Sequence, residues 1–501
     1  MSAPALYERF LRGLARAPHR PAVRVGDRSL TYRELHERAL RLAGALSVRC
    51  ERPPAAVAVL AGKGFEGYAG VLAALYTGAA VVPLNPAFPP ERTARMLALS
   101  DAGAVLADAA GTAVLARLPQ PLPPVLSVTA DGEPGEAGPA LERPRPVTAD
   151  AVACVLFTSG STGVPKGVPI RHSAFDHYFR LSDRRYDFGP RDVFSQTFDL
   201  NFDCAFFDLF SAWGAGAAVH PVPPHAYRDL AGFVAERGVT VWFSVPGTIG
   251  LARRTGVLTP GSMPSLRWSL FAGEALRDTD AADWLAAAPG STLENLYGPT
   301  ELTVTVAAYR WRPDTSPGLC VNGLSPIGAV HEGHRHLLLG EDGEPVADEG
   351  ELCVSGPQMA AGYLDPAEDA GRFTEHDGLT WYRTGDRVRR LPDGDLVYLG
   401  RRDGQVQVQG WRVELAEVDH AVRSCAGVAE AVTVTRPGPG GLELVVYYTG
   451  RPATAAVLAR ELRERVPAGM MPRHFEHVAE FPLNANRKVD RKALAARAAG
   501  G

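Results

Sequence analysis

The stretch LFTSGSTGVPKGVP, Leu156 to Pro169, holds three glycines, four hydroxyl side chains and one lysine in fourteen residues. Glycine lets a backbone approach a ligand closely, and hydroxyls, amide N–H groups and lysine donate to phosphate oxygens. The Walker loop needs Gly-Lys-Ser/Thr in succession, whereas Pro165 directly precedes Lys166 here. The stretch therefore predicts a phosphate-binding loop of another kind. A generic flexible linker is the alternative, which the apolar run before the loop and its lysine disfavour.

The sequence around the loop predicts its neighbours. AVACVLF, residues 151–157, has the apolar character of a buried strand, and HSAFDHYFRLSDRR, residues 172–185, has helical spacing. We expect the glycine loop to lie between this strand and this helix, where backbone N–H groups can converge on an anion.

Apolar runs and helical patterns alternate from residue 52 onward, which predicts a largely parallel sheet covered by helices. The expected strands are 55–62, 79–84 and 104–108, the expected helices are 67–78 and 91–103, and 118–149 is expected to be a surface connection.

The pattern changes after about residue 400. A polar/apolar alternation, two helices and two strands predict a compact α+β unit, with a frayed end at ALAARAAGG. We therefore expect an α/β protein with a large N-terminal domain, 1–400, of parallel sheets layered with helices. A small, mobile α+β domain, 401–501, would follow.

Composition excludes several function classes. A formal charge of -4 and 46% hydrophobic residues are typical of a globular chain and a poor fit to nucleic-acid or anionic-membrane binding. No apolar run reaches membrane-spanning length, and the N-terminus lacks the features of a secretory signal. Six scattered cysteines favour reduced thiols and a cytoplasmic location over a disulfide framework or a zinc site.

Lysine is rare in this chain. The four lysines are Lys63, Lys166, Lys488 and Lys492, whereas the other 48 of the 52 basic residues are arginine (52 - 4 = 48). Because a compact ammonium is not interchangeable with a planar guanidinium, lysines inside motif-like stretches are candidates for chemistry. Lys166 and Lys488 lie in such stretches.

The glycine loop resembles the phosphate loop of the adenylate-forming superfamily, which includes acyl-CoA synthetases, luciferases and adenylation domains of nonribosomal peptide synthetases. Further motifs of that superfamily follow in its order along nearly the whole chain. They are LTYREL from Leu30, NLYGPTE 295–301, GELCVSGPQMAAGYL 350–364, YRTGD 382–386, GRRDGQVQVQGWRVELAEVD 400–419 and PLNANRKVDRKAL 482–494.

The resemblance implies ATP and Mg²⁺ as cofactors and assigns roles by position. Tyr297 would stack on adenine, Asp386 would accept hydrogen bonds from the ribose, and Asp403 would be the hinge. Catalytic roles fall on Lys488, Thr300 and Glu301, with Glu301 also holding the metal. The implied ATP-binding residues are Thr158, Ser159, Gly160, Ser161, Thr162, Gly163, Lys166, Asn295, Tyr297, Gly298, Thr300, Asp386 and Arg401.

Some positions depart from the superfamily's pattern. Gln407 and Gln409 stand where Lys and Arg are usual, Arg387 replaces Leu, and Arg487 replaces Gly. The two glutamines put in doubt any contact that their cationic counterparts make to nucleotide or thiol substrate.

The segment FDCAFFDLFSAWGAGA resembles the superfamily's substrate-pocket motif and implies a set of pocket residues. They are Asp203, Cys204, Phe207, Gly247, Leu270, Ala272, Leu296, Val304 and Thr305, closed by Lys488. An isolated carboxylate among apolar side chains is costly unless a cation arrives with the ligand, so Asp203 predicts a substrate ammonium. A helix-capping role for Asp203 is the alternative.

We therefore expect a stand-alone adenylation enzyme of nonribosomal peptide or antibiotic biosynthesis. It would activate a neutral amino acid, whether proline-like, small aliphatic or β-amino, as aminoacyl-AMP. It would then transfer the aminoacyl group to the phosphopantetheine of a separate carrier protein, with coenzyme A as the second candidate acceptor. The alternatives are an acyl-CoA synthetase acting on a non-amino acid and a non-catalytic nucleotide-binding homologue. HEGHRH, 331–336, suggests a metal, but a solvated strand edge is favoured over a zinc site.

Overall fold

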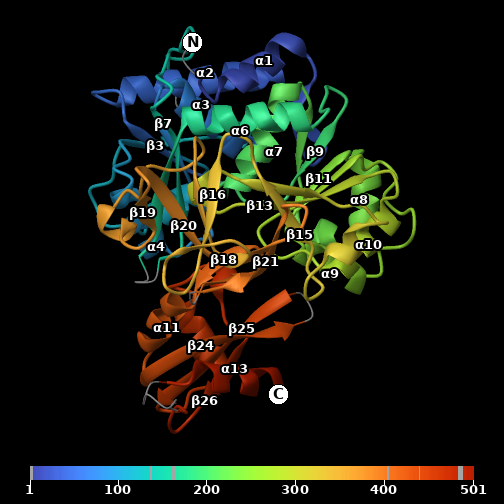
Figure 1. The fold of residues 1–501 in the computed structure, drawn as a ribbon. Helices are drawn as coiled ribbons and strands as arrows, with labels where there is room; N and C mark the ends of the chain where they lie inside the picture. The colour runs from blue at the N-terminus through green and yellow to red at the C-terminus, as the bar shows by residue number, and fades with distance from the viewer. Residues whose placement is uncertain are drawn as a thin grey trace.

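The structure is a computed structural model that describes residues 4–135, 138–160, 164–402, 405–438, 441–482 and 489–500. Figure 1 shows a larger part that contains the N-terminus and a smaller part, drawn in red, that contains the C-terminus. The architecture is a mixed α/β fold that contains parallel sheet strands and a smaller C-terminal subdomain, as the sequence predicts. Many strand pairs of the longer sheet are antiparallel, however, from β13 through β21.

One sheet of the larger part has the order β6-β5-β3-β4-β7-β8 in the described residues. Its strands are β3 (Ala56–Leu60), β4 (Ala80–Leu84), β5 (Ala104–Ala107), β6 (Val125–Ser127), β7 (Val152–Thr158) and β8 (Lys166–Arg171). The pairs β3/β4, β3/β5, β4/β7 and β5/β6 are parallel. The apolar runs that predicted β3, β4, β5 and β7 are buried, as strands covered by helices on both faces must be.

The position predicted for the glycine loop is wrong. The loop joins β7 to β8, and these two strands pair antiparallel from Thr158↔Lys166 to Val152↔Arg171. Helix α6 (His172–Arg185) begins only after β8. The described residues on either side of the loop therefore belong to two antiparallel strands, and α6 does not follow the loop directly.

A second, longer sheet has the order β17-β16-β18-β20-β21-β15-β14-β13-β12-β11-β9-β10-β1-β2, with β19 paired to β20, among the described residues. Its first strands in the chain are β1 (Pro21–Val25), β2 (Arg28–Thr31), β9 (Val193–Gln196), β10 (Ala218–Pro221), β11 (Val241–Ser244), β12 (Trp268–Phe271), β13 (Thr292–Tyr297) and β14 (Ala307–Arg310). The remaining strands are β15 (Pro326–Val330), β16 (Arg335–Leu339), β17 (Pro345–Val346), β18 (Glu349–Ser355), β19 (Phe373–His376), β20 (Leu379–Arg390) and β21 (Leu396–Arg401).

The helices of the larger part cover these sheets. They are α1 (Glu8–Arg16), α2 (Tyr32–Arg49), α3 (Phe65–Tyr76), α4 (Pro90–Leu99), α5 (Ala109–Leu115), α6, α7 (Asp203–Ala215), α8 (Leu230–Arg237), α9 (Gly247–Arg254) and α10 (Asp278–Ala287). Thr31 and Glu34 form a capping box that begins α2. No described helix has both the length and the apolar character that a membrane span requires.

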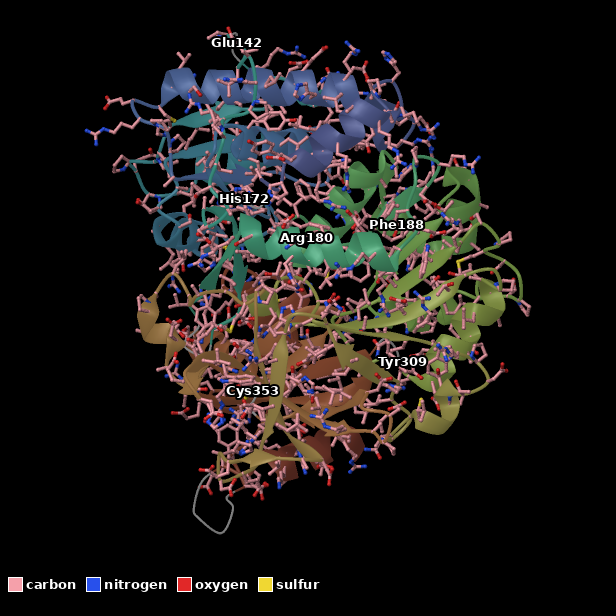
Figure 2. All side chains as sticks on the ribbon, turned by 45° about the horizontal axis from the view of Figure 1, so that its top comes forward. Glu142, His172, Arg180, Phe188, Tyr309 and Cys353 are labelled. Atoms are coloured by element: carbon pink, nitrogen blue, oxygen red, sulfur yellow. The ribbon has the colours of Figure 1, made fainter. Side chains whose placement is uncertain are left out.

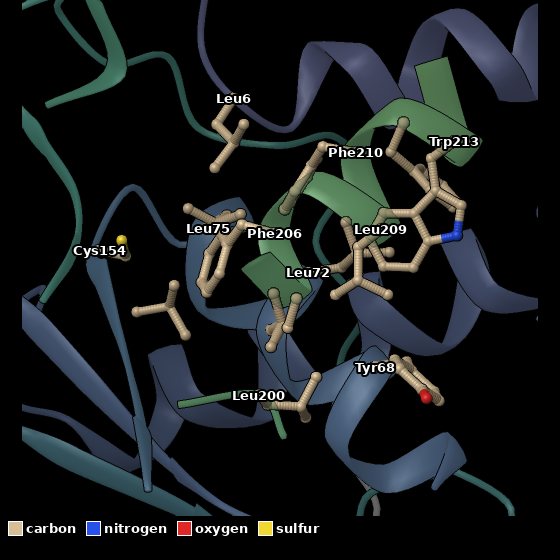
Figure 3. Close-up of a cluster of buried hydrophobic side chains, with 14 of the residues drawn as sticks. Leu6, Tyr68, Leu72, Leu75, Cys154, Leu200, Phe206, Leu209, Phe210 and Trp213 are labelled. Carbon is tan, nitrogen blue, oxygen red and sulfur yellow. The ribbon is translucent and has the colours of Figure 1, made fainter. Parts of the chain in front are cut away.

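Helix α7 lies at the centre of the core. All of its residues are buried, and most of them are apolar, so the helix packs against other elements on every face. Figure 3 shows Phe206, Leu209, Phe210 and Trp213 of α7 beside side chains of α3 such as Leu72. Because β7 of the first sheet contributes to the same cluster, α7 and α3 fix the two sheets relative to each other and so fix the edges that carry the site.

The C-terminal subdomain contains a two-stranded and a three-stranded sheet. Its elements are β22 (Gln405–Val408), β23 (Trp411–Glu414), α11 (Leu415–Arg423), β24 (Val428–Gly438), β25 (Gly441–Gly450), α12 (Ala455–Leu462), β26 (His474–His477) and α13 (Arg491–Gly500). The expected frayed end is wrong, because α13 buries Leu494 and Ala498 against β24 and β25. Residues four apart on a helix share one face, which is how a short alanine-rich helix docks here.

Candidate active site

The candidate site lies where parallel strands of the longer sheet end. Asp203 follows β9, Gly247 follows β11, Ala272 follows β12 and Gly298 follows β13. The carboxyl ends of neighbouring parallel strands meet at one edge of a sheet, which is where ligands of open α/β sheets bind. Residues distant in sequence are brought together for this reason.

The phosphate-loop residues that the structure describes have defined partners. Ser159 donates a hydrogen bond from Oγ to the Arg412 carbonyl at 2.7 Å. A Cβ on Gly160 would lie 2.0 Å from the Val164 carbonyl oxygen, so only glycine fits this turn. Lys166 is buried, and its Nζ lies 2.6 Å from a carboxylate oxygen of Glu368. Five predicted site residues, Ser161, Thr162, Gly163, Asp403 and Lys488, lie outside the described residues.

Three of the residues implied for nucleotide binding form one cluster. The Tyr297 hydroxyl donates to Asp386 Oδ2 at 2.6 Å, and Arg401 Nη1 donates to Asp386 Oδ1 at 2.6 Å. Asp386 and Thr384 both lie on β20, and the Thr384 carbonyl accepts a second hydrogen bond from Arg401, through Nη2, at 3.0 Å. Asn295 is engaged elsewhere, because its side-chain nitrogen donates to the Pro326 carbonyl at 2.8 Å.

The turn after β13 is tight. A Cβ on Gly298 would lie 2.6 Å from the Thr305 Cα. Thr303 and Val304 adopt positive φ angles of 58° and 65°, which are rare for β-branched residues. Strain of this kind persists only where the surrounding structure fixes the backbone, and it concentrates at functional sites. The turn carries Thr300 and Glu301 into the site.

Glu301 is fully buried and has two partners. Arg412 Nη1 lies 2.7 Å from Oε2, and the Tyr363 hydroxyl donates to Oε1 at 2.7 Å. Burial alone would raise the pKa of Glu301, but the Arg412 charge and the Tyr363 hydrogen bond outweigh it and lower the pKa to about 2. Glu301 is therefore ionised at neutral pH.

A magnesium ion fits this donor chemistry. A buried, ionised carboxylate beside the Thr300 hydroxyl offers the hard oxygen ligands that Mg²⁺ prefers. Arg412 now supplies the positive charge at Glu301. A metal bound to Glu301 would take over that charge, so the guanidinium and the ion compete for the same carboxylate.

Asp203 is the first residue of α7 and is 7% exposed. The Thr300 hydroxyl is close enough to hydrogen-bond to it, whereas its Oδ2 is buried and has no hydrogen-bond partner among the described residues. Burial raises the pKa of Asp203 to about 6, and the Thr300 contact opposes that rise. Oδ2 can therefore still accept a hydrogen bond, and no cationic side chain among the described residues forms an ion pair with Asp203.

The nine predicted pocket residues are divided among neighbouring spaces. Asp203, Cys204, Ala272 and Val304 line a central cavity of about 100 Å³, together with Thr158, Ser159 and Thr300. Leu296 and Thr305 line a second cavity, and Gly247 lines a third. Phe207 and Leu270 are fully buried members of the hydrophobic core.

Sequence reasoning missed the residues that the C-terminal subdomain adds to the central cavity. Gly410, Trp411 and Arg412 line it, beside Gln407, whose departure from the superfamily's pattern the sequence does show. The Trp411 ring packs against Phe202 at a centroid distance of 5.1 Å. Arg412, a lone cation between apolar neighbours in the alternating stretch 404–414, is the one sequence signal that could have marked this hairpin.

The family described as AMP-binding enzyme matches residues 10–364. The chain belongs to this family. Members of the AMP-binding family use ATP with Mg²⁺ and form adenylates.

Individual relatives cover the whole chain. Phenyloxazoline synthase MbtB of Mycobacterium sp. (strain MCS) is 34% identical over 510 residues, which is 99% of this chain and 42% of that protein. This chain therefore spans less than half of that relative. The crystal structure of IdnL7 is 57% identical with a TM-score of 0.76, covering 100% of this chain and 99% of that one. The Vibrio cholerae adenylation domain AlmE, solved with glycyl-adenosine-5'-phosphate, is 27% identical with a TM-score of 0.86, covering 99% and 98%.

Proposed function

We propose that this AMP-binding family member activates a small, neutral amino acid as an aminoacyl-adenylate and passes it to a phosphopantetheine thiol. The observation that carries the proposal is Asp203, a buried carboxylate with an unpartnered oxygen beside Thr300. A substrate ammonium would satisfy that oxygen. The relative AlmE, solved with a glycyl adenylate, supports an amino-acid substrate.

In the first half-reaction the substrate carboxylate attacks the α-phosphorus of ATP and pyrophosphate leaves. The carboxylate is already ionised at pH 7, so no general base is needed. Tyr297, Asp386 and Arg401 would hold the nucleoside, and the phosphate loop would position the phosphates. Mg²⁺ on Glu301 would supply charge neutralisation at the phosphoryl oxygens, and Lys488 would add a further positive charge.

The observed arrangement differs from the one that this step requires. Arg412 pairs with Glu301, and Ser159 donates to the Arg412 carbonyl, so β23 fills the phosphate end of the site. We propose that the C-terminal domain, 401–501, moves about Asp403 relative to the domain 1–400. Withdrawal of Arg412 would free Glu301 for the metal and allow Lys488 to serve adenylate formation.

The same arrangement suits the second half-reaction. A cavity of about 460 Å³ adjoins the central cavity and shares Phe198, Phe202 and Trp411 with it. Glu274 holds both sides of this cavity by accepting hydrogen bonds from Gly247 N at 2.9 Å and Gly410 N at 2.8 Å. A pantetheine arm could reach the adenylate here, where its thiol would attack the carbonyl carbon and AMP would leave.

Two measurements test this function. ATP–pyrophosphate exchange should be highest with a neutral, mainly aliphatic or cyclic amino acid and low with the matching deaminated acid. Intact-mass analysis should then show the aminoacyl group on a phosphopantetheinylated carrier protein in preference to coenzyme A. Transfer to coenzyme A with a deaminated acid would instead support an acyl-CoA synthetase. A lack of exchange with any acid would support a non-catalytic homologue.

A further inference from the structure

A cavity lies behind the predicted amino-acid pocket. We call it the rear cavity; its volume is about 320 Å³, and its lining includes Tyr178, Ser182, Leu296, Thr305 and His331. Leu296 and Thr305 are also two of the nine residues implied for the substrate pocket. The rear cavity is therefore adjacent to the space that the substrate side chain would occupy.

Tyr178 of α6 lines the rear cavity and contacts residues that are implied for the pocket. It is 3% exposed, and its hydroxyl accepts a hydrogen bond from Thr305 Oγ1 at 3.3 Å. Its ring packs edge-on against Phe207 at a centroid distance of 6.2 Å. Burial raises the pKa of Tyr178, and the hydrogen bond from Thr305 opposes that rise. Tyr178 thus contacts Thr305 and Phe207, two of the implied pocket residues, although no substrate motif contains it.

The position of α6 explains why Tyr178 is held there. Figure 2 shows α6 crossing the molecule from His172 past Arg180, with Phe188 beyond its end. Phe175 and Phe179 lie on the same helix and pack on Phe206 and Phe210 of α7. Since α7 also begins at Asp203, one helix pair positions both the carboxylate and the tyrosine.

The rear cavity contains polar atoms without partners. Ser182 Oγ and His331 Nδ1 are buried and make no hydrogen bond in the described structure. Burial lowers the pKa of His331 to about 3, so this side chain is neutral at pH 7. Buried polar atoms of this kind favour water or a ligand group that hydrogen-bonds to them. The exposed ion pair of Arg184 and Glu332, at 3.0 Å, lies at the outer end.

We propose that Tyr178, held by Thr305, determines the length of the substrate side chain, and that the rear cavity accepts longer side chains once this tyrosine is removed. The inference rests on the proposed function, because it assumes that the substrate side chain points toward Leu296 and Thr305. Tyr178 is a specificity-determining residue and takes no part in adenylate chemistry.

Two homologous substrate series test the inference. One is alanine, 2-aminobutyrate, norvaline and norleucine; the other is propionate, butyrate, pentanoate and hexanoate. kcat/KM for pyrophosphate exchange is measured for the wild type, Tyr178→Ala, Tyr178→Leu and Tyr178→Phe. One methylene changes selectivity by roughly 10- to 200-fold in an apolar pocket. The wild type should therefore show a drop of about tenfold or more at one step of the series.

In Tyr178→Ala that drop should move to a longer chain, so the norleucine-to-alanine ratio should rise at least about tenfold. Tyr178→Phe keeps the ring and should keep the wild-type profile. Tyr178→Leu, which preserves a buried apolar side chain, should also move the drop in kcat/KM to a longer chain. This variant provides the test if the alanine variant does not fold. His331→Ala, which enlarges the rear cavity behind an intact tyrosine, is the matched control and should leave the profile unchanged.

An unchanged length profile in the folded alanine or leucine variant would overturn the inference. A wild type that uses all four chain lengths equally would do the same without any variant. These outcomes are separate from the proposed function, which fails if the amine-free series matches the amino acids. In that case a length shift in the fatty acids would still support the role of Tyr178.

Discussion

Asp203→Asn is the substitution that separates an amine-binding pocket from an ordinary apolar one. It removes the negative charge but keeps the size and most hydrogen-bonding capacity of the side chain. If the substrate ammonium contacts Asp203 Oδ2, the variant leaves that ammonium buried without its counter-charge. Breaking a buried ion pair on one side costs about 3–5 kcal/mol, which corresponds to a loss of roughly 10²- to 10³-fold or more in kcat/KM.

Without substrate, the same substitution should have the opposite effect and stabilise the folded protein. A rise in the Asp203 pKa from 3.8 to about 6 corresponds to about 3 kcal/mol. A raised pKa means that the folded state binds the proton more tightly, so stability falls as pH rises from about 4 to 6. Without substrate, Asp203→Asn should therefore be more stable than the wild type at pH 8, by up to about 3 kcal/mol, with no gain below pH 4.

The assay is pyrophosphate exchange with the best amino acid and its deaminated analogue, alongside urea unfolding at the two pH values. Asp208→Asn is the matched control, since Asp208 is a fully buried acid five positions along α7. It should leave the amine preference unchanged. Equal losses of amino-acid and deaminated-acid activity in Asp203→Asn would refute the reasoning, as would an Asp208→Asn variant that loses the amine preference.

The remaining predictions concern the nucleotide and the moving subdomain. Arg412→Ala should leave pyrophosphate exchange intact or lower its Mg²⁺ requirement, because Glu301 loses only the cation that competes with the metal. The same variant should slow thioester formation, which we assign to the arrangement with Arg412 in place. Slower exchange at all Mg²⁺ concentrations would contradict this. Asp386→Asn should raise the KM for ATP, because each lost ribose hydrogen bond weakens ATP binding by about 1.5–3 kcal/mol. An unchanged KM would show that Asp386 does not contact the nucleotide. Gly298→Ala should displace the turn after β13 and cost roughly 1–3 kcal/mol in urea unfolding. Lys488→Ala should abolish exchange yet allow thioester formation from supplied aminoacyl-adenylate, and equal loss of both would oppose that division.

Much of the fold could be predicted because the relevant signals are local. The buried strands β3, β4 and β5 are short apolar runs, and α6 matches the predicted range 172–185. The hairpin of β7 and β8 was missed because Pro165, Gly167 and Pro169 obscure the strand pattern after the loop. What forms β8 is its backbone pairing with β7, and such pairing leaves little trace in side-chain periodicity.

The site was predictable where a motif keeps its residues together. Thr300 and Glu301 share one short 3₁₀ helix, so one motif places both. The ion pair between Glu301 and Arg412 joins residues 111 apart, and its existence depends on how the C-terminal subdomain sits. Tyr178 was missed for the same reason, since its position beside the pocket follows from the packing of α6 on α7.

The central claim is that Asp203 receives the substrate ammonium. The most direct measurement is a crystal structure with a non-hydrolysable aminoacyl-adenylate analogue of the preferred amino acid. The account predicts the substrate nitrogen at about 2.7–2.9 Å from Asp203 Oδ2, as in a charge-assisted hydrogen bond. A substrate nitrogen that contacts a different carboxylate, or that points toward solvent with Asp203 still unpartnered, would contradict it.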